Sequence, residues 1–124
     1  MILGLEHTAI ASPDHPSLAS WYVSVLGFVI NYQSANATFV KAPNGYMIEI
    51  IAAEGARGTA AMKTPGLRHL AVLVKDFDAV YADLKAKGVQ FLTEPSESKG
   101  NKLVFFTDPE GNILHLLERQ TPLP

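Results

Sequence analysis

The stretch LEHTA at residues 5–9 returns, with substitutions, as LRHLA at residues 67–71. A later segment, PNGYMIEII at residues 43–51, returns in the same way as PEGNILHLL at residues 109–117. The two motifs therefore occur twice in the same order, and this order indicates a chain built from two similar modules. Each module begins and ends with a segment whose apolar residues alternate in the manner of a β-strand.

Between these segments, each module carries the signals of one helix and further short strands. In the first module, the residues around Pro13 and Asp14 predict a helix start, and Gly27 predicts its end. In the second module, Asp76 is a typical N-cap and Gly88 follows the last helical turn. We expect strands over residues 2–11, 28–32, 37–41 and 46–51 in the first module, and over 67–74, 89–92, 102–107 and 113–118 in the second.

The length of 124 residues corresponds to one domain, residues 1–124. Within it we expect module one over about residues 1–53, a linker rich in glycine and alanine over 54–65, and module two over about 66–120. Each module alone is short for a stable core, so the modules should pack together or pair with another chain.

The composition excludes several classes of function. The chain has no cysteine, which removes disulfides, thiolate catalysis and cysteine-ligated metals. Ten basic and twelve acidic residues give a net charge of −2. This charge balance does not predict binding to nucleic acid or to a membrane surface. No apolar run approaches the length of a membrane span and no signal peptide is recognisable. These features predict a soluble, cytoplasmic single domain.

Alternation along the strands places the ionisable residues of each module on the face of the sheet that no helix should cover. Helices should cover one face of each sheet, and the other face should then carry His7 and Glu49 in the first module, and His69 and His115 in the second. A carboxylate such as Glu49 on an apolar strand is costly unless it is paired or binds a metal. With cysteine absent, these four residues are the candidate metal ligands.

A structural interpretation competes with the metal-binding one. A single histidine on a strand is more often hydrogen-bonded than metal-bound, and His7 and His69 occupy equivalent positions of a repeat, so they are not independent evidence. Glu49 and His115 are also equivalent, yet they differ in type while both remain able to bind a metal. We therefore favour a metal site, from which only His15 among the four histidines is left out.

The motifs together carry a family resemblance that spans nearly the whole chain. The relevant stretches are LEHTAI at 5–10, WY at 21–22, LGF at 26–28, GLRHLA at 66–71 and FFTDPEGN at 105–112. In this order they resemble the vicinal oxygen chelate superfamily. That superfamily includes glyoxalase I, the fosfomycin- and bleomycin-resistance proteins, methylmalonyl-CoA epimerase and the extradiol dioxygenases.

The resemblance implies an α+β fold in which two βαβββ modules form a cupped, barrel-like mixed sheet with helices on the outside. Metal ligands in such proteins come from the first and last strand of each module, which here are His7, Glu49, His69 and His115. The last of these is a departure, because this position is commonly Glu in the glyoxalase-like and dioxygenase relatives. Small relatives are usually homodimers, and the site could be built within one chain or across the dimer.

The departure at His115 has a chemical consequence. Three neutral imidazoles and one carboxylate leave a divalent ion with a net charge of +1, whereas two of each would leave it neutral. The ion then remains a stronger Lewis acid and accepts an anionic, oxygen-chelating substrate more readily. The ligand types suit Fe, Zn, Ni, Mn or Co and do not distinguish among them.

Three functions are compatible with these residues. The first is a metal-dependent lyase or isomerase, in which Glu49 is a ligand, the catalytic base, or both in turn. The second is a non-haem Fe(II) dioxygenase. The third is a drug- or metabolite-binding resistance protein without catalysis, whose groove the aromatic residues Phe39, Phe91, Phe105 and Phe106 could line. The polar segment 96–102 could be a lid, although an ordinary surface loop is the better expectation.

Overall fold

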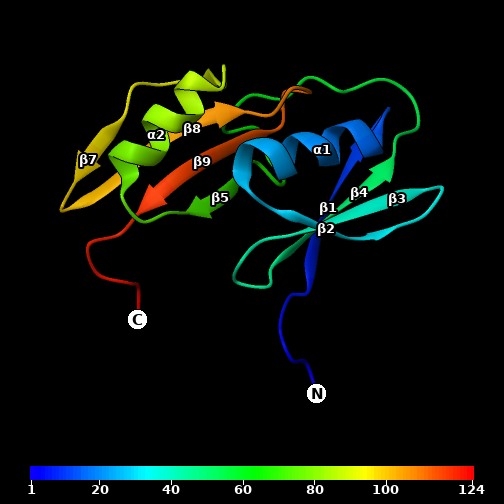
Figure 1. The fold of residues 1–124 in the computed structure, drawn as a ribbon, viewed down its shortest axis with the longest axis horizontal. Coiled ribbons are helices and arrows are strands. Elements are labelled where there is room, and N and C mark those ends of the chain that lie inside the picture. Colours follow the sequence, from blue (N-terminus) through cyan, green and yellow to red (C-terminus); the bar gives the residue numbers. More distant parts are fainter. The chain divides into compact units, whose positions relative to one another are not determined.

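The computed structural model describes all residues from Met1 to Pro124. The chain divides into two compact units, Met1–Arg57 and Gly58–Pro124, each with one helix and one sheet (Figure 1). The division falls inside the segment 54–65 that we expected to link the modules. No helix is long and apolar enough to cross a membrane.

The first unit has the order strand, helix and three strands. Its sheet runs β1-β4-β3-β2, with β1 parallel to β4 and the other neighbours antiparallel. Helix α1 packs against β3 and β4. The elements are β1 (His7–Ser12), α1 (His15–Leu26), β2 (Val29–Gln33), β3 (Ala37–Lys41) and β4 (Met47–Ala52).

Local chemistry sets the ends of α1. The Asp14 carboxylate accepts a hydrogen bond from the backbone N–H of Ser17 at 3.1 Å, and a proline occupies the first turn. Gly27 ends the helix with φ of 76°, a left-handed conformation that glycine adopts without steric cost. The helix start and stop predicted from the sequence are therefore confirmed.

The second unit repeats this plan with one additional strand. Its sheet runs β5-β9-β8-β6, with β5 parallel to β9, while β7 pairs with β8 off this path. Helix α2 packs against β9. The elements are β5 (Leu70–Leu73), α2 (Phe77–Ala86), β6 (Gln90–Phe91), β7 (Ser96–Ser98), β8 (Asn101–Thr107) and β9 (Ile113–Glu118).

Each sheet has a helix-covered face and an open face. In β4, Ile48 and Ile50 are buried beneath the helix, whereas Ile51 is exposed. In β9, Leu114 and Leu116 are buried in the same way. The expected α+β class, with two mixed sheets and a helix against one face of each, is confirmed.

Three local predictions are wrong. The strands expected over 2–11 and 67–74 begin only at His7 and Leu70, where pairing with the parallel partners β4 and β9 begins. Ser96–Ser98, expected in a surface loop, forms β7 by pairing with β8. Asp76 precedes α2 but its side chain makes no cap bond; instead the Glu118 carboxylate accepts from the Phe77 N–H at 3.3 Å.

Candidate functional site

His7 and Glu49 meet on the open face of the first unit. Glu49 lies in β4 directly opposite Ala9 of β1 on one side and Phe39 of β3 on the other. His7, at the start of β1, brings its Nε2 to 3.5 Å from the Glu49 Oε1. Their side chains are 33% and 27% exposed, so both remain accessible to a ligand.

Glu6 fixes the orientation of the His7 ring. The His7 Nδ1–H donates to the Glu6 Oε1 at 2.9 Å, and this bond turns the ring so that Nε2 is directed at Glu49. A carboxylate in this position is the usual partner of a metal-binding histidine, because it holds the ring and raises its basicity. Glu6 was not predicted from the sequence. Strand alternation would place Glu6 and His7 on opposite faces of the sheet, but the alternation applies only from His7 onward, where β1 begins.

His69 and His115 form the corresponding pair in the second unit. His115 lies opposite Ala71 of β5 and Phe105 of β8, the same register that places Glu49 in the first unit. His69 precedes β5 by one residue, and its ring meets that of His115 edge-on with centroids 4.6 Å apart.

His115 is held in its neutral form by its surroundings. It is only 7% exposed and stacks on Phe105 at 4.9 Å between ring centroids. Burial lowers the pKa of His115 below its ordinary value of 6.5, and the positive charges of His69 and Arg119 lower it further. Its Nδ1 is buried without a hydrogen-bond partner. A neutral imidazole with an unused polar atom suits a metal ligand.

The structure thus brings the four candidate ligands together as two pairs, one in each unit. It holds no group of three or more ligand-type side chains arranged around one point. The second unit also differs at the position of Glu6, where Arg68 donates to the carbonyl oxygens of Ala61 at 3.1 Å and Gly66 at 3.4 Å.

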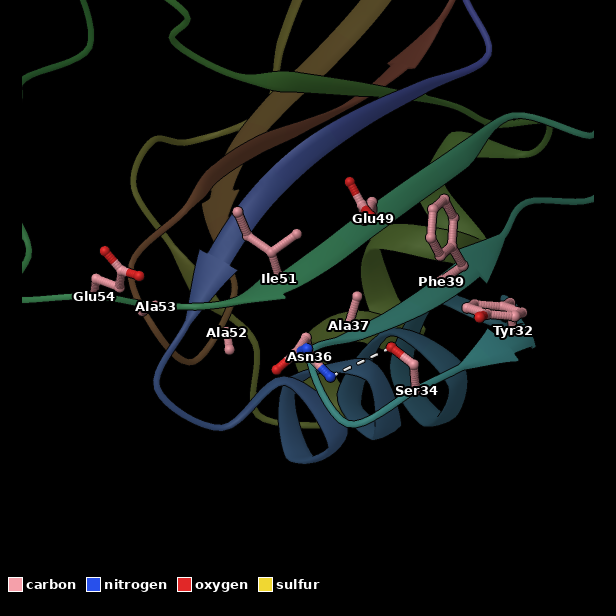
Figure 2. A pocket seen from close by; sticks show the side chains of 10 residues that line it. All are labelled: Tyr32, Ser34, Asn36, Ala37, Phe39, Glu49, Ile51, Ala52, Ala53 and Glu54. Atoms are coloured by element: carbon pink, nitrogen blue, oxygen red, sulfur yellow. Dashed lines mark hydrogen bonds between the residues drawn. The ribbon is translucent and has the colours of Figure 1, made fainter.

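A pocket of about 640 Å³ opens on the same face of the first unit as Glu49. Figure 2 shows Glu49 between the aromatic residues Phe39 and Tyr32 at one end and Glu54 at the other. The ten lining residues are Tyr32, Ser34, Asn36, Ala37, Phe39, Glu49, Ile51, Ala52, Ala53 and Glu54. Apart from Phe39 and Glu49, none was singled out from the sequence, because the pocket depends on how the β2–β3 turn and the end of β4 lie together.

The other residues considered from the sequence lie elsewhere. Phe106 is fully buried and in ring contact with Phe91, so these two belong to the core of the second unit and not to a groove. Glu118, set aside by parity, caps α2. His15 is buried and bonded to Thr38 Oγ1 at 2.8 Å and to the Ala35 carbonyl at 3.1 Å.

Residues 4–116 match the family model of the Glyoxalase/Bleomycin resistance protein/Dioxygenase superfamily. The chain belongs to this superfamily. It is 33% identical to the uncharacterized protein YaeR of Escherichia coli K12, over 95% of this chain and all of that protein.

Solved structures of other proteins share this fold. The oxidase ChaP-H2 superposes with a TM-score of 0.76 and 27% identity, over 96% of this chain and 95% of that one. A glyoxalase family protein from Enterococcus faecalis superposes with a TM-score of 0.78 and 26% identity, over 94% and 98% of the two chains. The resemblance noted in the motifs is therefore confirmed at the level of family and fold.

Proposed function

We propose that this superfamily member is a metal-dependent lyase or isomerase acting on a small substrate with two neighbouring oxygen atoms. His7, Glu49, His69 and His115 are the proposed ligands of one divalent ion. The observation that carries this proposal is the matched register of the two pairs: His7 with Glu49, and His69 with His115, occupy equivalent places on the open faces of the two sheets.

The chemistry of the donor set supports a metal. The lowered pKa of His115 keeps that imidazole neutral at pH 7, and a neutral imidazole is the form that binds metals. Three neutral imidazoles with one carboxylate give a divalent ion a net charge of +1. Such an ion, when bound, supplies Lewis-acid polarisation of substrate oxygens.

The protein's own residues supply binding, orientation and proton transfer. Glu49 borders the pocket and is its only carboxylate within contact of His7, so we assign it the role of base as well as ligand. Glu6 holds the His7 ring in place from behind. The aromatic wall beside Glu49 keeps water from one side of the reacting group.

Elemental analysis of the purified protein tests the metal directly. We expect one equivalent of a divalent metal such as Fe, Zn, Ni, Mn or Co per chain, and loss of the metal in His115→Ala. His15→Gln is the matched control, since this histidine also is buried but lies outside the proposed site. Full retention of metal in His115→Ala, with the fold intact by circular dichroism, would remove His115 from the ligand set.

A second function, a non-haem Fe(II) dioxygenase, has specific support. One structural relative at 27% identity is called an oxidase, and His7, His69 and Glu49 match the two-histidine, one-carboxylate composition of such sites. Oxygen uptake with the Fe(II)-loaded protein and a catechol distinguishes the two. Turnover that requires air assigns the dioxygenase, whereas anaerobic conversion of a thiol–aldehyde adduct assigns the lyase. Ligand binding that persists in chelator, without turnover, assigns a binding protein.

We also propose that the protein is a cytoplasmic homodimer. Strands β1 and β5 lie at the edges of their sheets, and large apolar side chains such as Leu73 and Val29 are 71% and 57% exposed. Open strand edges and exposed apolar residues are what a second copy would cover. Light scattering coupled to size-exclusion chromatography should give twice the chain mass of 13.4 kDa.

A further inference from the structure

The pocket of the first unit has two chemically different ends. At one end, the Phe39 ring meets Tyr32 edge-on at 5.9 Å between centroids and His7 in the same manner at 5.3 Å. Glu49 lies beside Phe39 in the neighbouring strand. This end therefore offers an apolar, planar wall next to the proposed metal ligands, a setting that suits a flat head group.

The other end carries a carboxylate. Glu54 is exposed and follows Glu49 by five residues, about 16 Å along an extended chain. Figure 2 shows Ile51 and Ala52 between the two glutamates, so the β4 side of the path from the aromatic end to Glu54 is apolar, while Ser34 and Asn36 line the pocket from the β2–β3 turn. An aliphatic spacer would fit along it.

The charges of the pocket all have the same sign. Glu49 and Glu54 are the only acidic or basic residues among those that line it, and no lysine, arginine or histidine is present. If Glu49 binds the proposed metal ion, Glu54 is the remaining charged side chain of the pocket, and it lies at the end far from the aromatic residues. Such a carboxylate attracts a cationic group and repels an anionic one.

The wall that faces this path is held in place. The His15 Nε2–H donates to the Ala35 carbonyl at 3.1 Å, and Nδ1 accepts from Thr38 Oγ1 at 2.8 Å. Ala35 lies in the turn whose residues Ser34 and Asn36 line the pocket. The Asn36 carbonyl also accepts from the Ala52 N–H at 2.9 Å, so the turn is tied both to α1 and to the end of β4. The pocket is therefore preorganised.

We infer that the substrate of this protein is an aromatic or similarly planar oxygen chelator that bears a cationic tail, with the tail recognised by Glu54. This inference rests on the proposed function, since the head group is taken to bind beside Glu49. It adds a specificity-determining residue, Glu54, that acts on the tail and not on the reacting atoms.

Three matched catechols test the inference on the zinc-loaded protein: 4-(4-aminobutyl)catechol, 4-butylcatechol and 4-(3,4-dihydroxyphenyl)butanoate. Zinc is not redox-active, so the ligands stay intact during titration calorimetry. We expect the amine to bind about two- to fivefold more tightly than the neutral compound, and the carboxylate to bind more weakly by a similar factor. The head group is the same in all three, so the ratios report the tail alone.

Variants of Glu54 decide the cause of the preference. Glu54→Gln should lower the ratio of carboxylate to amine Kd by about four- to 25-fold, to near one, and Glu54→Lys should reverse the preference, while 4-butylcatechol binds as before. Glu97→Gln, which removes the same charge from the exposed strand β7, is the control and should change nothing.

The outcomes separate this inference from the proposed function. Equal binding of the three tails, or a preference that survives Glu54→Gln, overturns the inference even if 4-butylcatechol binds in a zinc-dependent manner. Tail preference without any zinc dependence overturns the proposed function and leaves Glu54 as a specificity residue of a binding protein. Failure of all three compounds to bind overturns the assigned substrate class.

Discussion

The two units present different chemistry from the same strand register. In each, the last strand sets its ionisable residue between an alanine and a phenylalanine: Ala9, Glu49 and Phe39 in the first unit, Ala71, His115 and Phe105 in the second. Backbone pairing fixes these positions, whereas the side chains they carry can change without disturbing the sheet. The first unit has become acidic at Glu6 and Glu49, and the second has Arg68 and His115 at the same places.

This comparison predicts that the buried faces of the two units behave alike. Ile50→Ala in β4 and Leu116→Ala in β9 occupy equivalent, fully buried positions, so each should lower the free energy of unfolding by about 2–5 kcal/mol. Chemical denaturation measures both. Ile51→Ala, on the exposed side of β4, is the control and should cost far less. A large difference between the two buried variants would mean that the units are not equivalent in packing.

The open faces of the two units should differ in their contribution to metal binding, and the Glu49 carboxylate should contribute most. Glu49→Gln removes the only negative ligand of the proposed site, and we expect divalent metal affinity to fall by about 100-fold or more, because even loss of an outer partner costs about 10–100-fold. Competition with a chromogenic chelator measures this. The converse change, His115→Glu, makes the two pairs alike and should retain the metal. Unchanged affinity in Glu49→Gln would contradict its role as a ligand.

The residues just before the two histidines should also behave differently. Glu6→Ala removes the acceptor that orients His7 and should weaken metal binding by about 10–100-fold. Arg68→Gln, at the equivalent position, breaks only bonds to backbone carbonyls and should leave metal affinity nearly unchanged. Equal effects of the two substitutions would show that Glu6 does not act through His7.

The smallest expected effect is the pH dependence of the metal-free protein. Because the folded-state pKa of His115 is depressed, the unfolded chain binds a proton more readily, and stability is lost as the pH falls below about 6.5. Thermal unfolding between pH 7.5 and 5 in chelator measures this loss. His115→Phe should reduce the slope, since it removes the titrating group. An identical slope would mean that other groups cause the acid sensitivity.

Much of the fold could be predicted from the sequence, because the signals were local. Gly27 and Asp14 fix the ends of α1 through their own backbone and side-chain preferences, and period-two alternation placed Ile48 and Ile50 beneath the helix. The exceptions depend on distant partners. Strand β7 forms through backbone pairing with β8. Helix α2 is capped by the side chain of Glu118, which lies 41 residues from Phe77 in the sequence.

The site could be predicted only in part for the same reason. Strand parity and the repeat made His7, Glu49, His69 and His115 candidates, and the structure places them as two pairs, one in each unit. Glu6 and Glu54 were not found because neither lies within a regular strand, where parity applies. The sequence did not show which aromatic residues line a pocket and which belong to the core. Phe39 lines the pocket and Phe106 is buried in the core, although both were candidates for a groove.

Titration calorimetry of chelator-treated protein with zinc, on the wild type, His7→Ala, His115→Ala and the double variant, tests most directly whether both units serve one ion. We expect one ion per chain, with each single variant losing most of the affinity and the double variant losing little more, since two ligands of one ion are strongly coupled. Two independent ions per chain, or losses that add in full, would contradict a shared metal site.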